Sequence, residues 1–136
     1  MLAVTAVAVF GLAGCARQTP EVSLHGGGST VHSTAVGWCA NSDQRHCHTD
    51  KHRIPVLRVA AGTKLNVDVS AVVAKRAWVV LTDGKITSPV EHGVRFYKIK
   101  NPVPPNASFL LQVQTLGSAG QNITVTGNWV FRVTSA

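Results

Sequence analysis

Apolar and polar residues alternate with a period of two along much of the chain after residue 30. Residues 64–69 alternate without interruption, and residues 108–114 and 128–133 follow the same pattern. Because successive side chains of an extended segment point to opposite faces, these segments are predicted to be half-buried antiparallel β-strands. Further strands are predicted at residues 30–38, 54–60, 76–82 and 93–100.

Turn-forming residues separate the predicted strands, and only a short helical turn is expected, near Val72–Lys75. The turns lie at Ala61-Gly62, at Asp83-Gly84, between Pro102 and Asn106, and between Gly117 and Gln121. About seven antiparallel strands at this spacing predict an all-β fold, an immunoglobulin-like β-sandwich, with a small closed β-barrel as the alternative. The tryptophans Trp38, Trp78 and Trp129 each lie in a strand pattern and are expected to pack in its core.

The first fifteen residues differ in character from the rest of the chain. Residues 2–14 are apolar or small except for Thr5, and no Lys or Arg precedes them. As a helix they would span about 20 Å, which is less than the roughly 30 Å hydrocarbon core of a bilayer. The pattern therefore favours an export signal over a membrane-spanning helix.

The end of this run, Leu12-Ala13-Gly14-Cys15, resembles the lipobox of bacterial lipoprotein precursors. The resemblance implies cleavage before Cys15 and acylation of its thiol, and two acyl chains anchor a protein stably in a bilayer. We therefore predict a signal peptide at residues 1–14, a lipidated cysteine with a flexible tether at residues 15–29, and a β-sandwich domain at residues 30–136. The predicted location is the extracytoplasmic face of the cell membrane.

The charge of the chain lies entirely in the part that follows this leader. Lys and Arg number 13 against 6 Asp and Glu, which gives a formal net charge of +7. A basic exported domain is attracted to anionic lipid headgroups or wall polymers, whereas export makes nucleic acid an unexpected partner. The predicted basic surface consists of Lys75, Arg76, Arg95, Lys98 and Lys100.

Two cysteines and three histidines gather between residues 39 and 52. Once Cys15 is acylated, Cys39 and Cys47 are the remaining thiols, and outside the cytoplasm they are expected to form a disulfide. A zinc site that uses both sulfurs with His48 and His52 is an alternative, but it lacks the usual short cysteine spacing. A copper or zinc site made by His46, His48 and His52 alone is a second alternative.

Three features together resemble an uncharacterised family of small actinobacterial secreted or lipid-anchored proteins. They are the Cys39 and Cys47 pair, the segment Leu57–Val69 and the segment Val73–Trp78. The resemblance extends over roughly residues 30–135. No activity is assigned to that family, so the resemblance implies an exported β domain and no catalytic residue.

Motifs for catalysis are weak in this sequence. The segment Gly117–Gly120 lacks the spacing of a nucleophile elbow, and the acidic residues are scattered singly. We therefore expect no enzyme activity and no cofactor, and the sequence identifies no small-molecule substrate. The predicted function is that of a membrane-anchored envelope lipoprotein with a binding or accessory domain that contacts a membrane protein complex or an anionic envelope component. The alternative is a metal-binding lipoprotein that carries copper or zinc.

Overall fold

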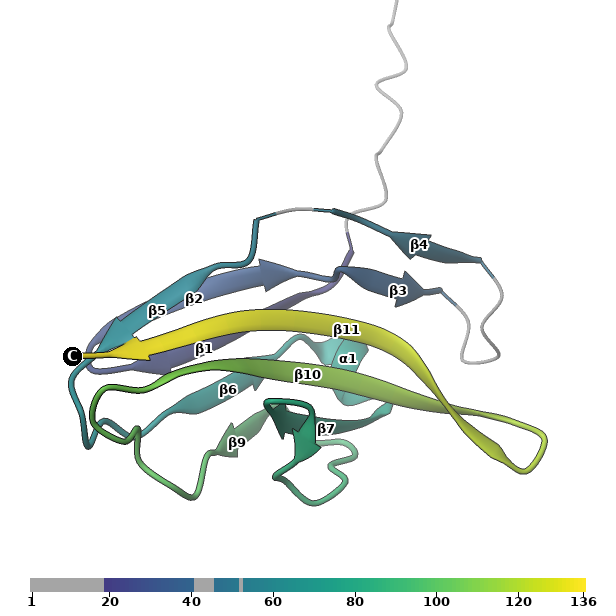
Figure 1. Ribbon diagram of the computed structural model, residues 1–136. Coiled ribbons are helices and arrows are strands. Elements are labelled where there is room, and N and C mark those ends of the chain that lie inside the picture. Colours follow the sequence, from purple (N-terminus) through teal and green to yellow (C-terminus); the bar gives the residue numbers. More distant parts are fainter. Residues whose placement is uncertain (1–18, 41–45, 52) are drawn as a thin grey trace, which may run out of the picture.

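The computed structural model describes residues 19–40, 46–51 and 53–136 and contains two packed β-sheets (Figure 1). The first sheet has the order β2-β1-β6-β9, with β1 at Glu21–Gly26, β2 at Ser29–Thr34, β6 at Asn66–Val69 and β9 at Phe96–Lys98. The second has the order β4-β3-β11-β10-β7-β8, with β3 at Gly37–Cys39, β4 at Cys47–Thr49, β7 at Ala77–Thr82, β8 at Lys85–Ile86, β10 at Ser108–Ala119 and β11 at Asn122–Ser135. The predicted β-sandwich is confirmed.

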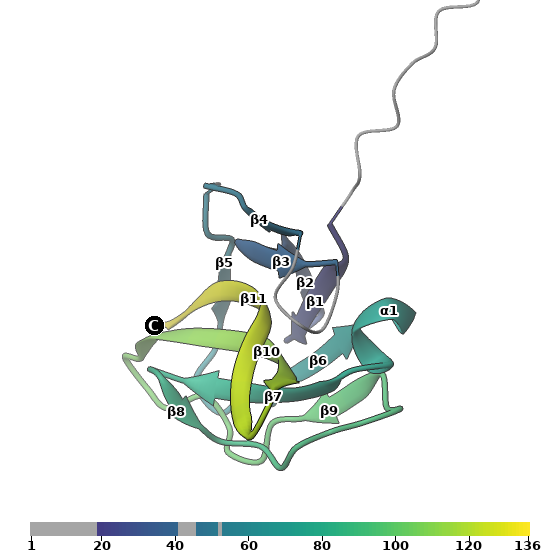
Figure 2. The same cartoon turned by 90° about the vertical axis from the view of Figure 1, so that its right-hand side faces the viewer.

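Two smaller elements complete the fold. Strand β5 (Val56–Val59) pairs with the last residues of β11 and runs parallel to it. This pair differs from the prediction, in which all strands are antiparallel. The helix α1 (Ala71–Ala74) lies close to the predicted helical turn and joins β6 to β7. In Figure 2, α1 lies where the two sheets come together at one end of the sandwich. The chain thus passes from the first sheet to the second through α1.

The core consists of the inward-facing half of each alternating strand. The first sheet contributes Val22, Leu24, Val67 and Val69, and the second contributes Leu57, Trp78, Val80, Leu111, Val113, Trp129, Phe131 and Val133. Trp78 and Trp129 are fully buried, as the sequence predicts. Burial of such side chains contributes about 1.5–3 kcal/mol each, which makes this layer the main source of stability.

Residues 21–34 form a hairpin, so the prediction of a flexible tether over residues 15–29 is wrong for its second half. Strands β1 and β2 pair from Glu21↔Thr34 to Gly26↔Ser29. Gly27 and Gly28 adopt φ values of 58° and 77°, the left-handed conformations that a tight hairpin turn requires. The glycine run is therefore a turn, and the inward side chains of Val22 and Leu24 hold β1 in the core.

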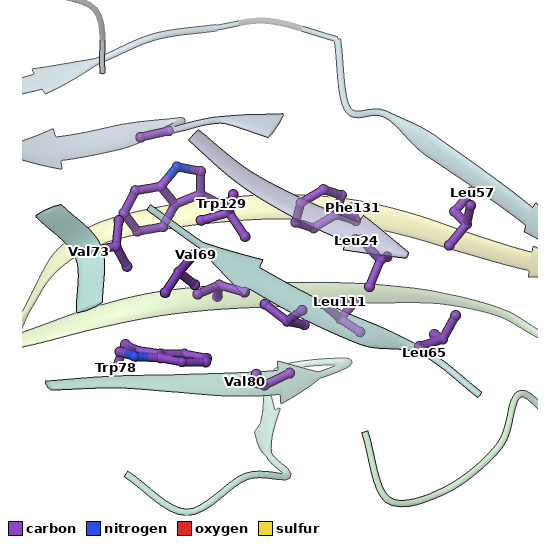
Figure 3. Close-up of a cluster of buried hydrophobic side chains, with 14 of the residues drawn as sticks. Leu24, Leu57, Leu65, Val69, Val73, Trp78, Val80, Leu111, Trp129 and Phe131 are labelled. Atoms are coloured by element: carbon purple, nitrogen blue, oxygen red, sulfur yellow. The ribbon is translucent and has the colours of Figure 1, made fainter. Parts of the chain in front are cut away.

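The described chain enters the sandwich beside its largest buried residues. The indole nitrogen of Trp129 donates a hydrogen bond of 2.8 Å to the carbonyl oxygen of Pro20. Val22 pairs with Val69, the last residue of β6, and Val69 lies two residues before Ala71, the first residue of α1. Figure 3 shows Val73 of α1 beside Trp129 at one end of the core, with Leu57 and Leu65 at the other. We call these the Pro20 end and the Val103 end, because Val103 is buried near Leu65 in the loop after β9.

The long β10–β11 hairpin changes register near Trp129. The pairing shifts between Thr115 and Leu116, and there the hydroxyl groups of Thr115 and Thr126 are hydrogen-bonded at 3.0 Å in the core. Gly127 follows directly, and a Cβ atom at this position would lie 2.6 Å from Thr115 Oγ1 and 2.9 Å from the Trp129 ring. The irregular pairing therefore needs a glycine at position 127 for steric reasons.

We expect Gly127→Ala to destabilise the fold by about 1–3 kcal/mol, because the added methyl group overpacks the core. Gly37→Ala is the matched control, since the nearest atom to a Cβ there is His48 O at 4.0 Å. Chemical denaturation of both variants measures the difference. Equal stabilities of the two variants would contradict the steric argument.

Candidate functional site

The disulfide predicted between Cys39 and Cys47 is present. The two residues are paired across β3 and β4, with their sulfur atoms 2.06 Å apart. Cys39 is buried and Cys47 is exposed, and the bridge joins the two strands of a projecting ribbon whose strand β3 pairs with β11 at the edge of the second sheet. Because the sulfurs bind each other, they are not thiolate ligands for zinc.

Arg76 fastens this ribbon to the body of the sandwich. Its guanidinium donates hydrogen bonds of 2.8 Å to the carbonyl oxygens of Cys39 and Ala40, and it lies 3.9 Å from the centre of the Trp38 ring. Trp38 in turn contacts Trp129, with ring centres 5.7 Å apart. Partial burial lowers the pKa of Arg76, but the ordinary pKa of arginine is so high that the group stays charged.

The residues of the predicted basic surface do not form one surface. Arg76 is half-buried in the contacts just described, and the Nε of Arg95 donates to the carbonyl oxygen of Val69 at 3.1 Å. Lys75 ends α1 and lies with Arg95 at the Pro20 end. By contrast, Lys98 is paired with Asn66, and Lys100 lines a cavity at the Val103 end. The charge is therefore divided between two ends of the sandwich.

The predicted histidine metal site is described only in part. His46 has a left-handed φ of 57°, and His48 lies exposed on β4. His52 and the lipidation residue Cys15 lie outside the described residues, so both assignments stay predictions. Among residues 19–40, 46–51 and 53–136, no group of three or more His, Cys, Asp or Glu side chains is arranged to hold a metal ion.

The hairpin of β1 and β2 carries a serine, a histidine and a glutamate that the sequence analysis did not single out. His32 Nδ1 lies 2.8 Å from Ser23 Oγ and 3.0 Å from Glu21 Oε1. A catalytic triad needs the serine and the acid on opposite ring nitrogens, so that the ring passes a proton between them. Here both contacts use Nδ1, so the arrangement is a surface contact between neighbouring strands and not a proton relay.

Comparisons with known proteins assign no family to the chain. Neither protein-family models, curated protein sequences nor solved structures gave a significant match. Within the part of the chain that the structure describes, no helix has the length and apolar character needed to cross a membrane.

We expect Arg76→Lys to destabilise the fold by about 1–2 kcal/mol even though the charge is kept. Lysine presents a point charge and cannot reproduce the planar fork that reaches two carbonyl oxygens and stacks on an indole. Arg58→Lys, at an exposed position on β5, is the matched control and should change stability by less than about 0.5 kcal/mol. Denaturant unfolding of the oxidised proteins compares them. An unchanged unfolding midpoint for Arg76→Lys would refute the stabilising role of the Arg76 contacts, which we call the Arg76 clamp.

Proposed function

We propose that the chain is a lipid-anchored envelope protein whose β-sandwich is a non-catalytic binding or accessory domain. The observation that carries the proposal is the Cys39–Cys47 disulfide. Disulfides persist in oxidising compartments, and this one uses two of the three cysteines. The third, Cys15, directly follows the apolar run and stands at the end of the lipobox-like sequence. An immunoglobulin-like relationship of the sandwich is part of this proposal, as it is of the sequence prediction.

The length of chain between Cys15 and the sandwich supports close contact with the bilayer. The hydrogen bond from Trp129 fixes the carbonyl group of Pro20. Cys15 precedes Pro20 by five residues, which span at most about 17 Å when fully extended. An acyl anchor on Cys15 therefore keeps the Pro20 end within that distance of the membrane surface.

The side chains at the Pro20 end suit such a position. Val72 on α1 and the pair Val94 and Phe96 are exposed apolar residues, and Lys75 and Arg95 supply positive charge beside them. The loop before β9 is held to α1 by a hydrogen bond from Gly93 N to Ala74 O. Apolar side chains with neighbouring cations fit the headgroup region of an anionic bilayer. In this orientation the opposite end of the sandwich is free to meet an envelope component or a membrane protein complex.

We expect Cys15→Ser to abolish acylation and to release the domain from the membrane, because the thiol is the proposed site of attachment. Growth with an alkyne-tagged fatty acid followed by fractionation measures both effects. The double variant Cys39→Ser/Cys47→Ser is the matched control, since it removes the other two cysteines and should keep the label. A label that persists in Cys15→Ser, or a cytosolic protein with residues 1–14 intact, would exclude the anchor.

A further inference from the structure

A cavity of about 300 Å³ lies between the two sheets at the Val103 end. Apolar side chains beside β6, in β10 and in the loop after β9 line it, and they are those of Leu65, Ile99, Val103, Pro104 and Phe109. Ile99 and Phe109 are half-buried, so their side chains are partly open to an incoming molecule. An apolar cavity of about 150 Å³ is enough to bind benzene, so the volume here accommodates a ligand of roughly ten carbon atoms.

Backbone hydrogen bonds hold the loop that walls this cavity in place. Ile99 N donates to Leu65 O at 2.9 Å, which fixes the start of the loop. Val103 N donates to Thr63 O at 2.9 Å, and Gly62 N donates to Val103 O at 2.7 Å. The apolar wall is therefore in place before any ligand arrives.

The charged groups at the cavity favour neither an anion nor a cation. Among the described residues that line it, Lys100 and Asp83 are charged, and their charges are opposite. The other polar side chains of the lining are uncharged, and they are those of Thr82, Thr87 and Asn101. Moving an unpaired charge from water into an apolar site is costly. The lining therefore suits an uncharged ligand.

A threonine takes the last inward position of β7, where the core meets the cavity. Thr82 pairs with Leu111 and follows Val80 by two residues, and both of these side chains lie in the core. Thr82 Oγ1 lies 3.3 Å from Thr87 Oγ1, and the Thr87 hydroxyl donates to the carbonyl oxygen of Val80 at 3.3 Å. A hydroxyl group has one proton, so Thr82 is the donor to Thr87 and keeps its acceptor lone pairs. The cavity thus presents a hydrogen-bond acceptor beside apolar walls.

We propose that the cavity at the Val103 end binds an uncharged apolar alcohol. The hydroxyl group of the ligand donates to Thr82 Oγ1, and its hydrocarbon part lies between Ile99 and Phe109. A hydroxyl group is a small uncharged donor, so it meets the threonine and leaves the rest of the ligand against the apolar walls. This inference rests on the binding role proposed above and names a ligand class for it, but it does not depend on the lipid at Cys15.

The test uses residues 15–136, the proposed mature chain, which contains every residue that the structure describes. Cys15→Ser removes the acyl group, so that it does not compete for the cavity. Methyl NMR signals are followed during titration with 1-octanol, octanoate and octylammonium, which share one hydrocarbon chain and differ in charge. We expect 1-octanol to bind at least about fivefold more tightly than either ion. Saturable shifts are expected for Ile99 and Val103, and none for Val73 at the Pro20 end.

Paired variants locate the two parts of the ligand. Thr82→Val removes the acceptor and should weaken 1-octanol binding about fivefold, whereas the control Thr49→Val, at an exposed position on β4, should change it less than twofold. Ile99→Trp places an indole at the cavity and should abolish the saturable shift of Val103. The control Val94→Trp adds the same ring at the Pro20 end and should leave binding unchanged.

Each contrary result overturns a stated part of the proposal. Equal affinity for either ion would overturn the uncharged ligand class, and unchanged affinity of Thr82→Val would overturn the hydrogen bond. Saturable shifts at the Pro20 end, or binding that survives Ile99→Trp, would overturn the location. None of these results bears on acylation of Cys15, so failure of the site and failure of the anchor are distinguishable.

Discussion

The burial of Trp129 between the two sheets is the constraint on which most of this structure depends. Its ring is fully buried, its indole nitrogen holds the carbonyl group of Pro20, and its face meets Trp38. A buried indole N–H without a hydrogen-bond partner would cost about 1–3 kcal/mol. Pro20, directly before β1, must therefore stay where its carbonyl oxygen accepts this hydrogen bond. Through Trp38 the same residue positions the Arg76 clamp and therefore the disulfide ribbon. One side chain thus connects the beginning of the described chain, the projecting ribbon and the core.

The alternation of residues predicts the central strands well, because half-burial imposes its period directly on the sequence. Segments 64–69, 108–114 and 128–133 lie in or overlap β6, β10 and β11. The predicted strand at residues 30–38 overlaps β2, but its partner β1 was missed although its signal is present, since Val22 and Leu24 alternate with polar residues before a glycine turn. The composition of the glycine run resembles that of a flexible linker, and only its left-handed glycines distinguish a hairpin turn from one.

Some features of the candidate sites can be predicted from the sequence, and others depend on contacts between residues that are distant in the sequence. The disulfide is predictable, because the export and the acylation of Cys15 that the sequence predicts would leave a single pairing. The stacking of Arg76 on Trp38 is not, since the two residues are 38 positions apart and meet only after both sheets have formed. Grouping basic residues by their closeness in the sequence likewise joined Lys100 to Arg95, although Arg95 precedes β9 at the Pro20 end and Lys100 follows it at the Val103 end.

The separation of the two ends restricts what can reach the cavity. Strand β1 runs from the Pro20 end toward the Val103 end, and its six residues span about 20 Å. If a short acylated segment holds the Pro20 end at the headgroups, the Val103 end stands about that much farther from the bilayer when the strands are upright. A lipid that remains in its leaflet then cannot reach the cavity that Val103 and Phe109 line. Under this proposal, a molecule that contacts the Val103 end must therefore come from outside the headgroup region, which fits a domain that meets its partner away from the membrane surface.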